Sequence, residues 1–222
     1  MPGRVTYALD GEIAVLSMDD GKANALAPEM SEGLNAGLDR AAREAKAVVI
    51  RGRPGVLCGG YDLRIIRGED EALRARMRAL GTALMLRIYM SPQPVVWACT
   101  GHAVAAGAIL LMAGDIRIGA RGDFRIGLNE TAIGLPLPYV ATELAKDRLA
   151  PTERQKAVVM AKLYDPEAAV GAGYLDEAVA PDAVDAAAMD AARGLAALDA
   201  YAFAETKRRM RAATVERVRV LG

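Results

Sequence analysis

One carboxylate stands out because charged neighbours are scarce around it in the chain. Glu130 lies in the segment 126–138, and the nearest charged residues are Arg125 and Glu143. A carboxylate in an apolar pocket has a raised pKa, so it can take up and return protons near neutral pH. An isolated glutamate more often caps a helix or faces solvent. The segment alone therefore leaves both proton transfer and a structural role open.

Two segments rich in small residues could hold a ligand oxygen with main-chain amides. The first, residues 55–63, places Gly59 and Gly60 at a bend after a buried strand, where the backbone can approach a ligand. The second, residues 101–108, leads into an apolar helix, whose first amides have no internal partner and lie at the positive end of the helix dipole. A tight loop and close helix packing are the ordinary explanations of such segments.

The other chemistry-bearing side chains are few. Acidic and basic residues number 28 each among 222, and His102 is the single histidine. A neutral chain gives no electrostatic argument for binding nucleic acid or an anionic membrane. Cys58 and Cys99 lack a CxxC spacing, and nothing marks a base paired with Cys58. We therefore expect free thiols in a reducing, cytoplasmic compartment, and no metal site.

The segments that must position these residues alternate between strand and helix patterns. Apolar runs predict strands at 5–9, 13–18, 47–50, 95–99 and 116–119, with a hairpin turn at Asp10-Gly11. Helical spacing or continuous apolar character predicts helices at 28–46, 69–86, 104–113, 138–149, 152–163, 165 onward, 183–197 and 202–218. Thr152 and Gln155 have capping-box spacing, and Asp165 is a candidate N-cap. This alternation implies an α/β fold.

The uncharged stretch from Ile88 to Gly114 is long enough to raise the question of a membrane span. Pro92 and Pro94 interrupt its start, and Thr100-Gly101-His102 breaks its middle. These breakers predict a buried strand, a turn and a buried helix instead. We also expect no signal peptide, because polar and apolar residues alternate after the first residues of the chain.

Four motifs in this order resemble those of the crotonase (enoyl-CoA hydratase/isomerase) superfamily, across nearly the whole chain. They are Lys22 to Leu26, Leu57 to Leu63, Pro94 to Ile118 and Asp165 to Val179. Each motif is loose by itself, but their shared order is specific. The resemblance implies the crotonase (ClpP-like) α/β fold, a spiral of ββα units at residues 1–180 with a C-terminal helical trimerisation region at 181–222. It also implies a homotrimer or hexamer.

The resemblance further implies an acyl-coenzyme A thioester as substrate and a role for three residues. The main-chain amides of Tyr61 and Ala106 would form an oxyanion hole for the thioester oxygen, and Glu130 would be the catalytic acid–base. The family usually has glycine at the position of Ala106, but alanine keeps the amide. Because coenzyme A is part of the substrate, we expect no separate cofactor.

Five further residues are implied to contact coenzyme A, namely Lys22, Ala23, Cys58, Gly59 and Arg64. Lys22 and Arg64 would meet its phosphates, although solvated surface charge is an equal interpretation. The main chain at Cys58 and Gly59 would hydrogen-bond the adenine.

Asp62 and His102 lie beside these motifs, and we expect structural roles for both. Aspartate commonly bonds nearby backbone amides, so Asp62 should order the loop that carries Tyr61. Relatives often have an aromatic residue at the position of His102, which favours packing over catalysis.

The resemblance also bears on the reaction. Hydratases of the family use two glutamates, and the position of the first is Ile109 here, whereas Glu130 matches the second. The segment Ile126 to Gly134 is similar to the mitochondrial-type Δ3,Δ2-enoyl-CoA isomerases, which use one glutamate. This implies an isomerase in which Glu130 removes a proton from C2 of a 3-enoyl thioester and returns one at C4. The dienolate formed between these steps would be held by the oxyanion hole.

Other activities stay open at this point, because reactions vary widely on this scaffold. They are hydration by Glu130 alone, as in an enoyl-CoA hydratase, and hydrolysis or decarboxylation of a thioester. A catalytically degenerate acyl-CoA-binding subunit is a further alternative, because the first glutamate is lost and Ala106 replaces a glycine.

Overall fold

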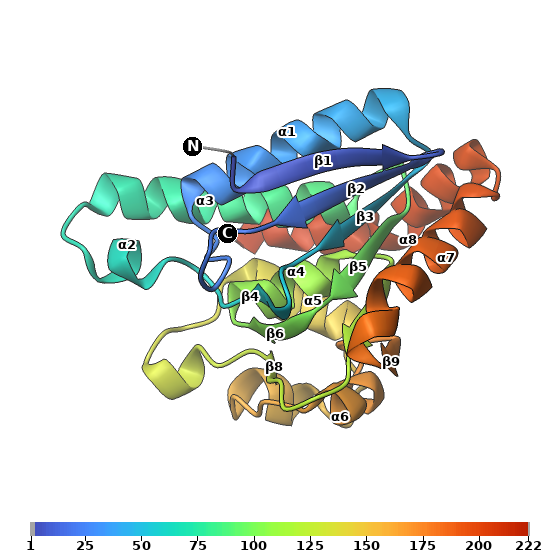
Figure 1. Cartoon of the computed structure of the whole chain (residues 1–222). Coiled ribbons are helices and arrows are strands. Elements are labelled where there is room, and N and C mark those ends of the chain that lie inside the picture. Colours follow the sequence, from blue (N-terminus) through green and yellow to red (C-terminus); the bar gives the residue numbers. More distant parts are fainter. Residues whose placement is uncertain (1–2, 222) are drawn as a thin grey trace.

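The computed structural model describes residues 3–221, in which two sheets are built from parallel repeats (Figure 1). The larger sheet has the order β1-β2-β3-β5-β7-β9, and the smaller has the order β4-β6-β8. The strands of the larger sheet are β1 (Val5–Asp10), β2 (Ile13–Met18), β3 (Ala47–Arg51), β5 (Val95–Cys99), β7 (Ile116–Ala120) and β9 (Glu177–Val179). The smaller sheet contains β4 (Gly55–Cys58), β6 (Gly101–Val104) and β8 (Ile126–Gly127). All pairs except the β1–β2 hairpin are parallel.

The helices follow these strands and complete the repeats. They are α1 (Pro28–Glu44), α2 (Leu63–Arg67), α3 (Glu71–Tyr89), α4 (Ala106–Ala113), α5 (Tyr139–Arg148), α6 (Pro166–Ala172), α7 (Val184–Ala196) and α8 (Ala200–Leu221). Short turns of other helix types lie at η1 (Thr131–Ile133), η2 (Gln155–Val159) and η3 (Pro181–Ala183). From β3 onward, one strand of each repeat joins the larger sheet, the next joins the smaller sheet, and a helix follows. The predicted spiral of ββα units is thereby confirmed.

The core explains why the central segments are so apolar. Every residue of α4 is buried, as the continuous apolar run predicted, because the helix lies between the smaller sheet and the helices α3 and α5. Trp97 of β5 and Tyr89 of α3 are among the largest fully buried side chains. Within residues 3–221, no helix is long and apolar enough to cross a membrane. The stretch 88–114 forms the end of α3, then β5, β6 and α4.

The helix predicted at 152–163 is wrong. Only the π-helical turn η2 forms there, and its first turn has no side-chain cap. Tertiary contacts outweigh the local helical pattern, because the backbones of Tyr164 and Ile126 bond to each other at 2.9 Å in both directions. The side chain of Glu153 accepts from Tyr164 Oη at 2.9 Å instead of supporting a helix start. Ala161 has a φ of 52°, which turns the chain toward this bridge.

The predicted boundaries of the other elements agree with the structure in part. Asp165 caps α6 by accepting from the Ala168 amide at 2.7 Å, as predicted. The strands β4 and β6 and the helix α2 were not predicted, because they are short and contain or adjoin glycines. The central helix starts at Ala106 rather than at residue 104, because residues 101–104 pair in the smaller sheet.

The two last helices pack onto the rest of the chain. A second hydrophobic cluster joins α7 to one face of the larger sheet, through buried residues such as Val184, Ala188 and Val96. Helix α8 packs against α5, and its Lys207 and Arg211 both bind Asp115, which precedes β7. The boundary at residue 180 and the trimerisation role of residues 181–222 stay predictions.

Candidate active site

The bend after β4 brings two chain segments into contact. Gly60 has a φ of 105°, and a Cβ atom there would lie only 3.0 Å from the Ala105 Cβ. The same Cβ would lie 3.8 Å from the backbone nitrogen of Ala106. Only glycine fits this conformation and this contact without strain. The bend therefore places the residue after it, Tyr61, beside the start of α4.

The start of α4 is shaped by an unusual backbone. Ala105 has a φ of 53° and a ψ of −124°, a sparsely populated conformation of the kind that clusters at functional sites. Its amide donates to Gly127 O at 3.0 Å. A Cβ on Gly107 would lie 2.2 Å from Cys58 O, so glycine allows the helix to approach the end of β4. These contacts fix the first amide of α4 next to the bend.

The amides of Tyr61 and Ala106 are available to a ligand. Neither donates a hydrogen bond to another group of the chain within residues 3–221. The Ala106 amide also lies in the first helical turn, where no internal acceptor exists. Two neighbouring free amides can bind an oxygen that becomes negative during a reaction.

The Tyr61 side chain is packed rather than reactive. Its hydroxyl lies against α3, where a Cβ on Gly81 would be 2.3 Å away from it. Burial raises the pKa of the Tyr61 phenol well above its usual range. The phenol therefore stays protonated, and its main chain is the part left for chemistry.

Glu130 is a buried carboxylate without an ion pair in the described residues. Glu130 is 8% exposed, and its Oε2 has no hydrogen-bond partner within residues 3–221. Its own carbonyl accepts from the amides of Ile133 at 3.0 Å and Leu135 at 2.9 Å, which fixes the turn. The side chain makes no capping bond to η1, so the capping interpretation has no support. Burial raises the pKa of Glu130, while the amides of Asn129 and Glu130 oppose this rise.

The smaller sheet brings these groups together. Its three parallel strands end at one edge, and each is followed closely by one candidate, Tyr61 after β4, Ala106 after β6 and Glu130 after β8. Parallel strands commonly present ligand sites at their carboxyl ends. Burial raises the pKa of the Tyr61 phenol, and the charge of Glu130 adds to this rise. This edge is therefore the candidate active site.

A loop beside β4 holds the predicted coenzyme A contacts. Gly59 donates from its amide to Ala23 O at 2.8 Å, which ties residues 22–23 to the end of β4. Lys22, Ala23 and Gly59 are exposed, whereas Cys58 is buried. The Gly59 amide is already used in this contact, so a ligand would have to meet other groups of the loop.

Asn24 orders this loop, a role that the sequence analysis missed. It is fully buried with a φ of 49°, and its Nδ2 donates to Met18 O at 3.0 Å and Leu57 O at 3.2 Å. Its Oδ1 accepts from the Asp20 amide at 2.9 Å. The signal in the sequence was an asparagine at a turn, since asparagine tolerates positive φ.

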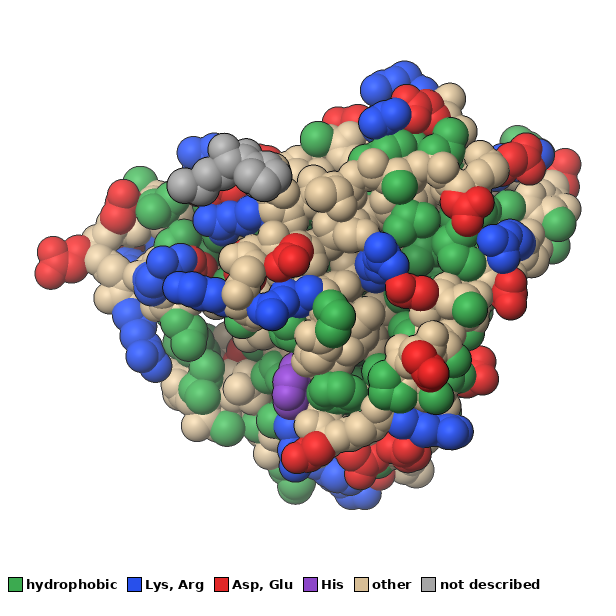
Figure 2. Space-filling view, in the orientation of Figure 1, with side chains coloured by type: hydrophobic (Ala, Val, Ile, Leu, Met, Phe, Trp, Pro, Cys, Tyr) green, Lys and Arg blue, Asp and Glu red, His purple; other side chains and the backbone are tan. Residues whose placement is uncertain are grey.

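Asp62 orders the loop that carries Tyr61, which confirms the predicted role. It accepts from the Arg64 amide at 2.9 Å and so caps α2. It also accepts from the Arg64 guanidinium at 2.7 Å, while the Arg64 side chain stays 82% exposed. Figure 2 shows a hollow between the part of the chain that carries α2 and the segment that carries η1, with basic side chains nearby.

Cys58 and His102 have structural surroundings. Burial raises the pKa of the Cys58 thiol to about 12, so it is not a nucleophile at neutral pH. His102 Nδ1 accepts from the Arg125 amide at 3.0 Å, and its ring stands edge-on to Phe124 with centroids 5.3 Å apart. Packing of His102 is thus confirmed.

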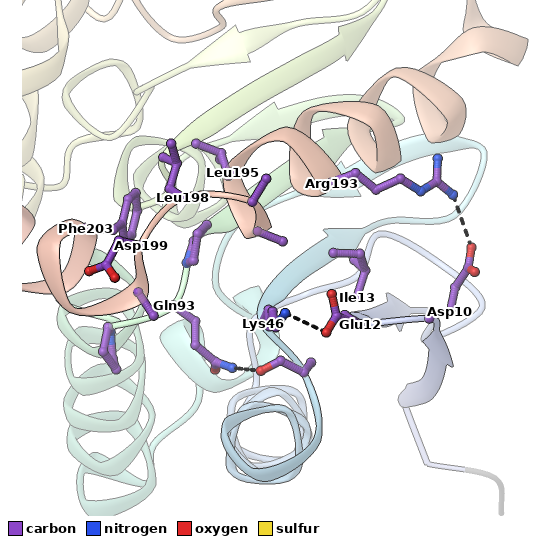
Figure 3. Close-up of a pocket in the computed structure, with 17 residues that line it drawn as sticks. Asp10, Glu12, Ile13, Lys46, Gln93, Arg193, Leu195, Leu198, Asp199 and Phe203 are labelled. Atoms are coloured by element: carbon purple, nitrogen blue, oxygen red, sulfur yellow. Dashed lines mark hydrogen bonds and ion pairs between the residues drawn. The ribbon is translucent and has the colours of Figure 1, made fainter.

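A cavity of about 780 Å³ lies away from this edge, between the β1–β2 turn and the junction of α7 and α8 (Figure 3). Two ion pairs border it, Lys46 with Glu12 at 2.7 Å and Arg193 with Asp10 at 3.5 Å. None of the predicted site residues lines it. This cavity is therefore separate from the candidate residues at the edge of the smaller sheet.

Comparisons with known proteins show the family of the chain. Residues 9–220 match the family model described as enoyl-CoA hydratase/isomerase. The chain is 28% identical over 210 residues to human mitochondrial enoyl-CoA delta isomerase 1, covering 93% of this chain and 70% of that protein. An apo structure of a Mycobacterium tuberculosis protein, described there as an enoyl-CoA isomerase, is 43% identical, with a TM-score of 0.94 over 99% of this chain and 96% of that chain. Another structure of the same protein is described as a probable enoyl-CoA hydratase. An enoyl-CoA hydratase structure from Mycobacterium ulcerans is 42% identical, with a TM-score of 0.95 over 98% and 96%.

Proposed function

The chain belongs to the enoyl-CoA hydratase/isomerase family, and we propose that within this family of acyl-CoA enzymes it is a Δ3,Δ2-enoyl-CoA isomerase. In this proposal the amides of Tyr61 and Ala106 hold the thioester oxygen, and Glu130 moves a proton from C2 to C4. The observation that carries the proposal is the buried Glu130 carboxylate, which has no ion pair and no partner at Oε2 within residues 3–221 and follows the strand edge where both free amides lie.

The chemistry of the step fits these groups. Removal of a C2 proton from a 3-enoyl thioester places negative charge on the thioester oxygen and spreads it to C4. Two preorganised amides stabilise this charge, and one such donor is typically worth about 10²–10³ in kcat. The protonated Glu130 then returns a proton at C4, which leaves the double bond between C2 and C3. One base on one face can serve both carbons.

The residue one turn into α4 supports an isomerase over a two-acid hydratase. Ile109 stands three positions after Ala106 and is fully buried. An isoleucine can neither position water nor transfer a proton. The human mitochondrial isomerase named above is a relative with the proposed activity.

Hydration by Glu130 alone is the second candidate, because a structure similar to this chain is described as an enoyl-CoA hydratase. Product analysis separates the two activities. The purified protein is given 3-enoyl-CoA and, separately, 2-enoyl-CoA, and the products are identified by mass and double-bond position. We expect 3-enoyl-CoA to become 2-enoyl-CoA without a mass change. Formation of 3-hydroxyacyl-CoA from 2-enoyl-CoA, with no double-bond shift, would reverse this ranking.

Binding of coenzyme A at Lys22, Ala23, Cys58, Gly59 and Arg64 is part of the proposal. The exposure of Lys22 and Arg64 beside this edge supports it. Replacing either by alanine should raise KM for the acyl-CoA and leave kcat unchanged, since each would bind the substrate and the transition state equally. Assembly into a homotrimer or hexamer is likewise proposed from the family resemblance, and light scattering of the purified protein tests it.

A further inference from the structure

Tyr174 is a buried phenol without a partner. Its exposed fraction is 0%, and its hydroxyl makes no hydrogen bond to residues 3–221. It directly follows Gly173, the C-cap of α6, and its ring lies against Tyr164 with centroids 5.7 Å apart. Buried tyrosine hydroxyls usually find an acceptor, so this one requires a physical explanation.

Two unpaired acceptors lie on the segment that follows β8, the strand against which α6 packs. They are Asn129 Oδ1 and Glu130 Oε2, both buried and without a hydrogen-bond partner among residues 3–221. The bridge between Tyr164 and Ile126 holds the aromatic pair next to β8, which leads into this segment. Burial raises the pKa of Tyr174. The Leu128 backbone opposes this rise, and the charge of the Glu130 carboxylate adds to it. The donor and the acceptors therefore occupy one region of the core.

The phenol has one hydrogen to donate. A hydrogen bond to an ionised carboxylate is roughly twice as strong as one to a neutral amide oxygen. Glu130 in its charged form is thus the better acceptor of the two. Hydrogen bonds of catalytic groups are often long or misaligned in ligand-free structures and need only small side-chain shifts to form.

We propose that Tyr174 is a positioning residue that donates its hydroxyl hydrogen to the ionised Glu130 carboxylate and so fixes the direction of that side chain. The proposal rests on the proposed role of Glu130 as the base. The carboxylate keeps its second oxygen for the protons at C2 and C4 of the substrate. Tyr174 itself does not touch the reacting atoms.

The surroundings of Glu130 make the effect of Tyr174 measurable. The Glu130 charge acts on the phenols of Tyr61 and Tyr174, whereas burial raises the pKa of Glu130 itself and two backbone amides oppose that rise. A hydrogen bond to the carboxylate stabilises its charged form and lowers its pKa. Removing the phenol hydroxyl should therefore raise the pKa of Glu130.

The test uses Tyr174→Phe in the whole protein, with kcat/KM for 3-enoyl-CoA measured against pH. The acid limb of this profile reports the base in the free enzyme. We expect it to move upward by about one pH unit, which is about a tenfold loss of kcat/KM on the acid side. In a Glu130→Gln background, Tyr174→Phe should cause no further loss. A limb that stays in place, or a full additional loss in that background, would overturn the proposal.

Tyr164→Phe is the matched control, because Tyr164 belongs to the same aromatic pair but bonds Glu153 at 2.9 Å. It should leave the acid limb unchanged. Tyr174→Met, which also lacks a donor, should shift the limb in the same direction as Tyr174→Phe. If both Tyr174 variants merely change the unfolding midpoint in urea and leave the limb in place, Tyr174 is a packing residue and the proposal is wrong.

A second readout does not depend on turnover. Carbon NMR of labelled glutamate carboxyls, with Glu130→Gln to assign the signal, gives the pKa of Glu130 directly. We expect this pKa to be higher in Tyr174→Phe than in the unchanged protein, and equal values would contradict the proposal. A protein that isomerises no 3-enoyl-CoA would refute the proposed function, whereas the NMR titration would still decide the role of Tyr174.

Discussion

Replacing Asp115 by asparagine should destabilise the fold far more than replacing Lys207 by methionine. Asp115 binds Lys207 at 2.7 Å and Arg211 at 2.9 Å, and the three side chains are only 9%, 5% and 10% exposed. One carboxylate is therefore the shared counter-ion of two buried cations that join α8 to the sheet. A neutral asparagine at this position would leave both cations without a counter-ion, and breaking a buried pair in this way costs about 3–5 kcal/mol.

The Lys207→Met variant leaves Asp115 and Arg211 as a pair of opposite charges. Asp115 keeps its bonds to Arg211 and to the Val95 amide at 2.8 Å when Lys207 is replaced by methionine. Only one hydrogen-bonded contact to Asp115 is lost, and a buried cation is removed at the same time. The change in stability should stay within about 1 kcal/mol, the net worth of one hydrogen bond. Urea unfolding followed by circular dichroism measures both variants.

A second measurement is the pH dependence of the difference in stability between the unchanged protein and Lys207→Met. Burial lowers the pKa of Lys207 to about 8, below its ordinary value of 10.5, although Asp115 opposes this shift. Between these pH values the unfolded chain binds more protons, so stability rises with pH through this group. The full shift corresponds to a loss of folding stability of about 3 kcal/mol. This loss is present below about pH 8 and disappears as the pH rises toward 10.5.

The unchanged protein should therefore gain stability relative to Lys207→Met as the pH rises through this window. Buried cysteines and tyrosines titrate equally in both proteins and cancel in the comparison. A flat difference across this window would refute the reasoning about Lys207. Equal stabilities of Asp115→Asn and Lys207→Met would refute the assignment of Asp115 as the shared counter-ion.

Three further outcomes follow from the geometry. Ala106→Pro removes one free amide at a helix position that tolerates proline, so kcat for 3-enoyl-CoA should fall about 10²–10³-fold, whereas Ala106→Gly keeps activity. Gly81→Ala places a Cβ 2.3 Å from the Tyr61 hydroxyl and should cost about 1–3 kcal/mol by overpacking. Gly171→Ala, whose added Cβ would have nothing within 4 Å, should instead stabilise α6 by about 0.5–1 kcal/mol. Thermal unfolding of the Gly81→Ala and Gly171→Ala proteins measures both effects. Cys58, whose pKa burial raises to about 12, should react with a thiol reagent only after unfolding, and rapid labelling of the native protein would contradict this.

Local signals in the sequence predicted those parts of the fold that local physics decides. The uniformly apolar run that became α4 could only be a buried element, and Asp165 before Pro166 marked a helix start. The strands β4 and β6 escaped prediction because they are short and carry glycines that are required by close backbone approach. The expected helix at 152–163 failed because the bridge of Tyr164 to Ile126 redirects the chain.

The candidate site could be predicted in part for the same reason. Glu130 was conspicuous for its lack of charged neighbours along the chain, and the glycine bend before Tyr61 marked a place for a free amide. Asn24 carried only the weak signal of an asparagine at a turn, and Tyr174 carried none, because their importance arises from groups far away in the sequence. Asn24 bonds Leu57 O, and Tyr174 lies next to the turn that holds Glu130. Only the folded chain brings these partners together.

The most direct test of the central claim is the rate at which Glu130→Gln converts 3-enoyl-CoA to 2-enoyl-CoA near neutral pH. Glutamine has nearly the same shape but cannot accept the C2 proton, so the rate should fall by about 10²–10⁴-fold or more. Glu167→Gln, which changes an exposed glutamate on α6, is the control and should keep full activity. A Glu130→Gln protein that isomerises within about tenfold of the unchanged rate, well short of the loss expected for a missing general base, would contradict the account.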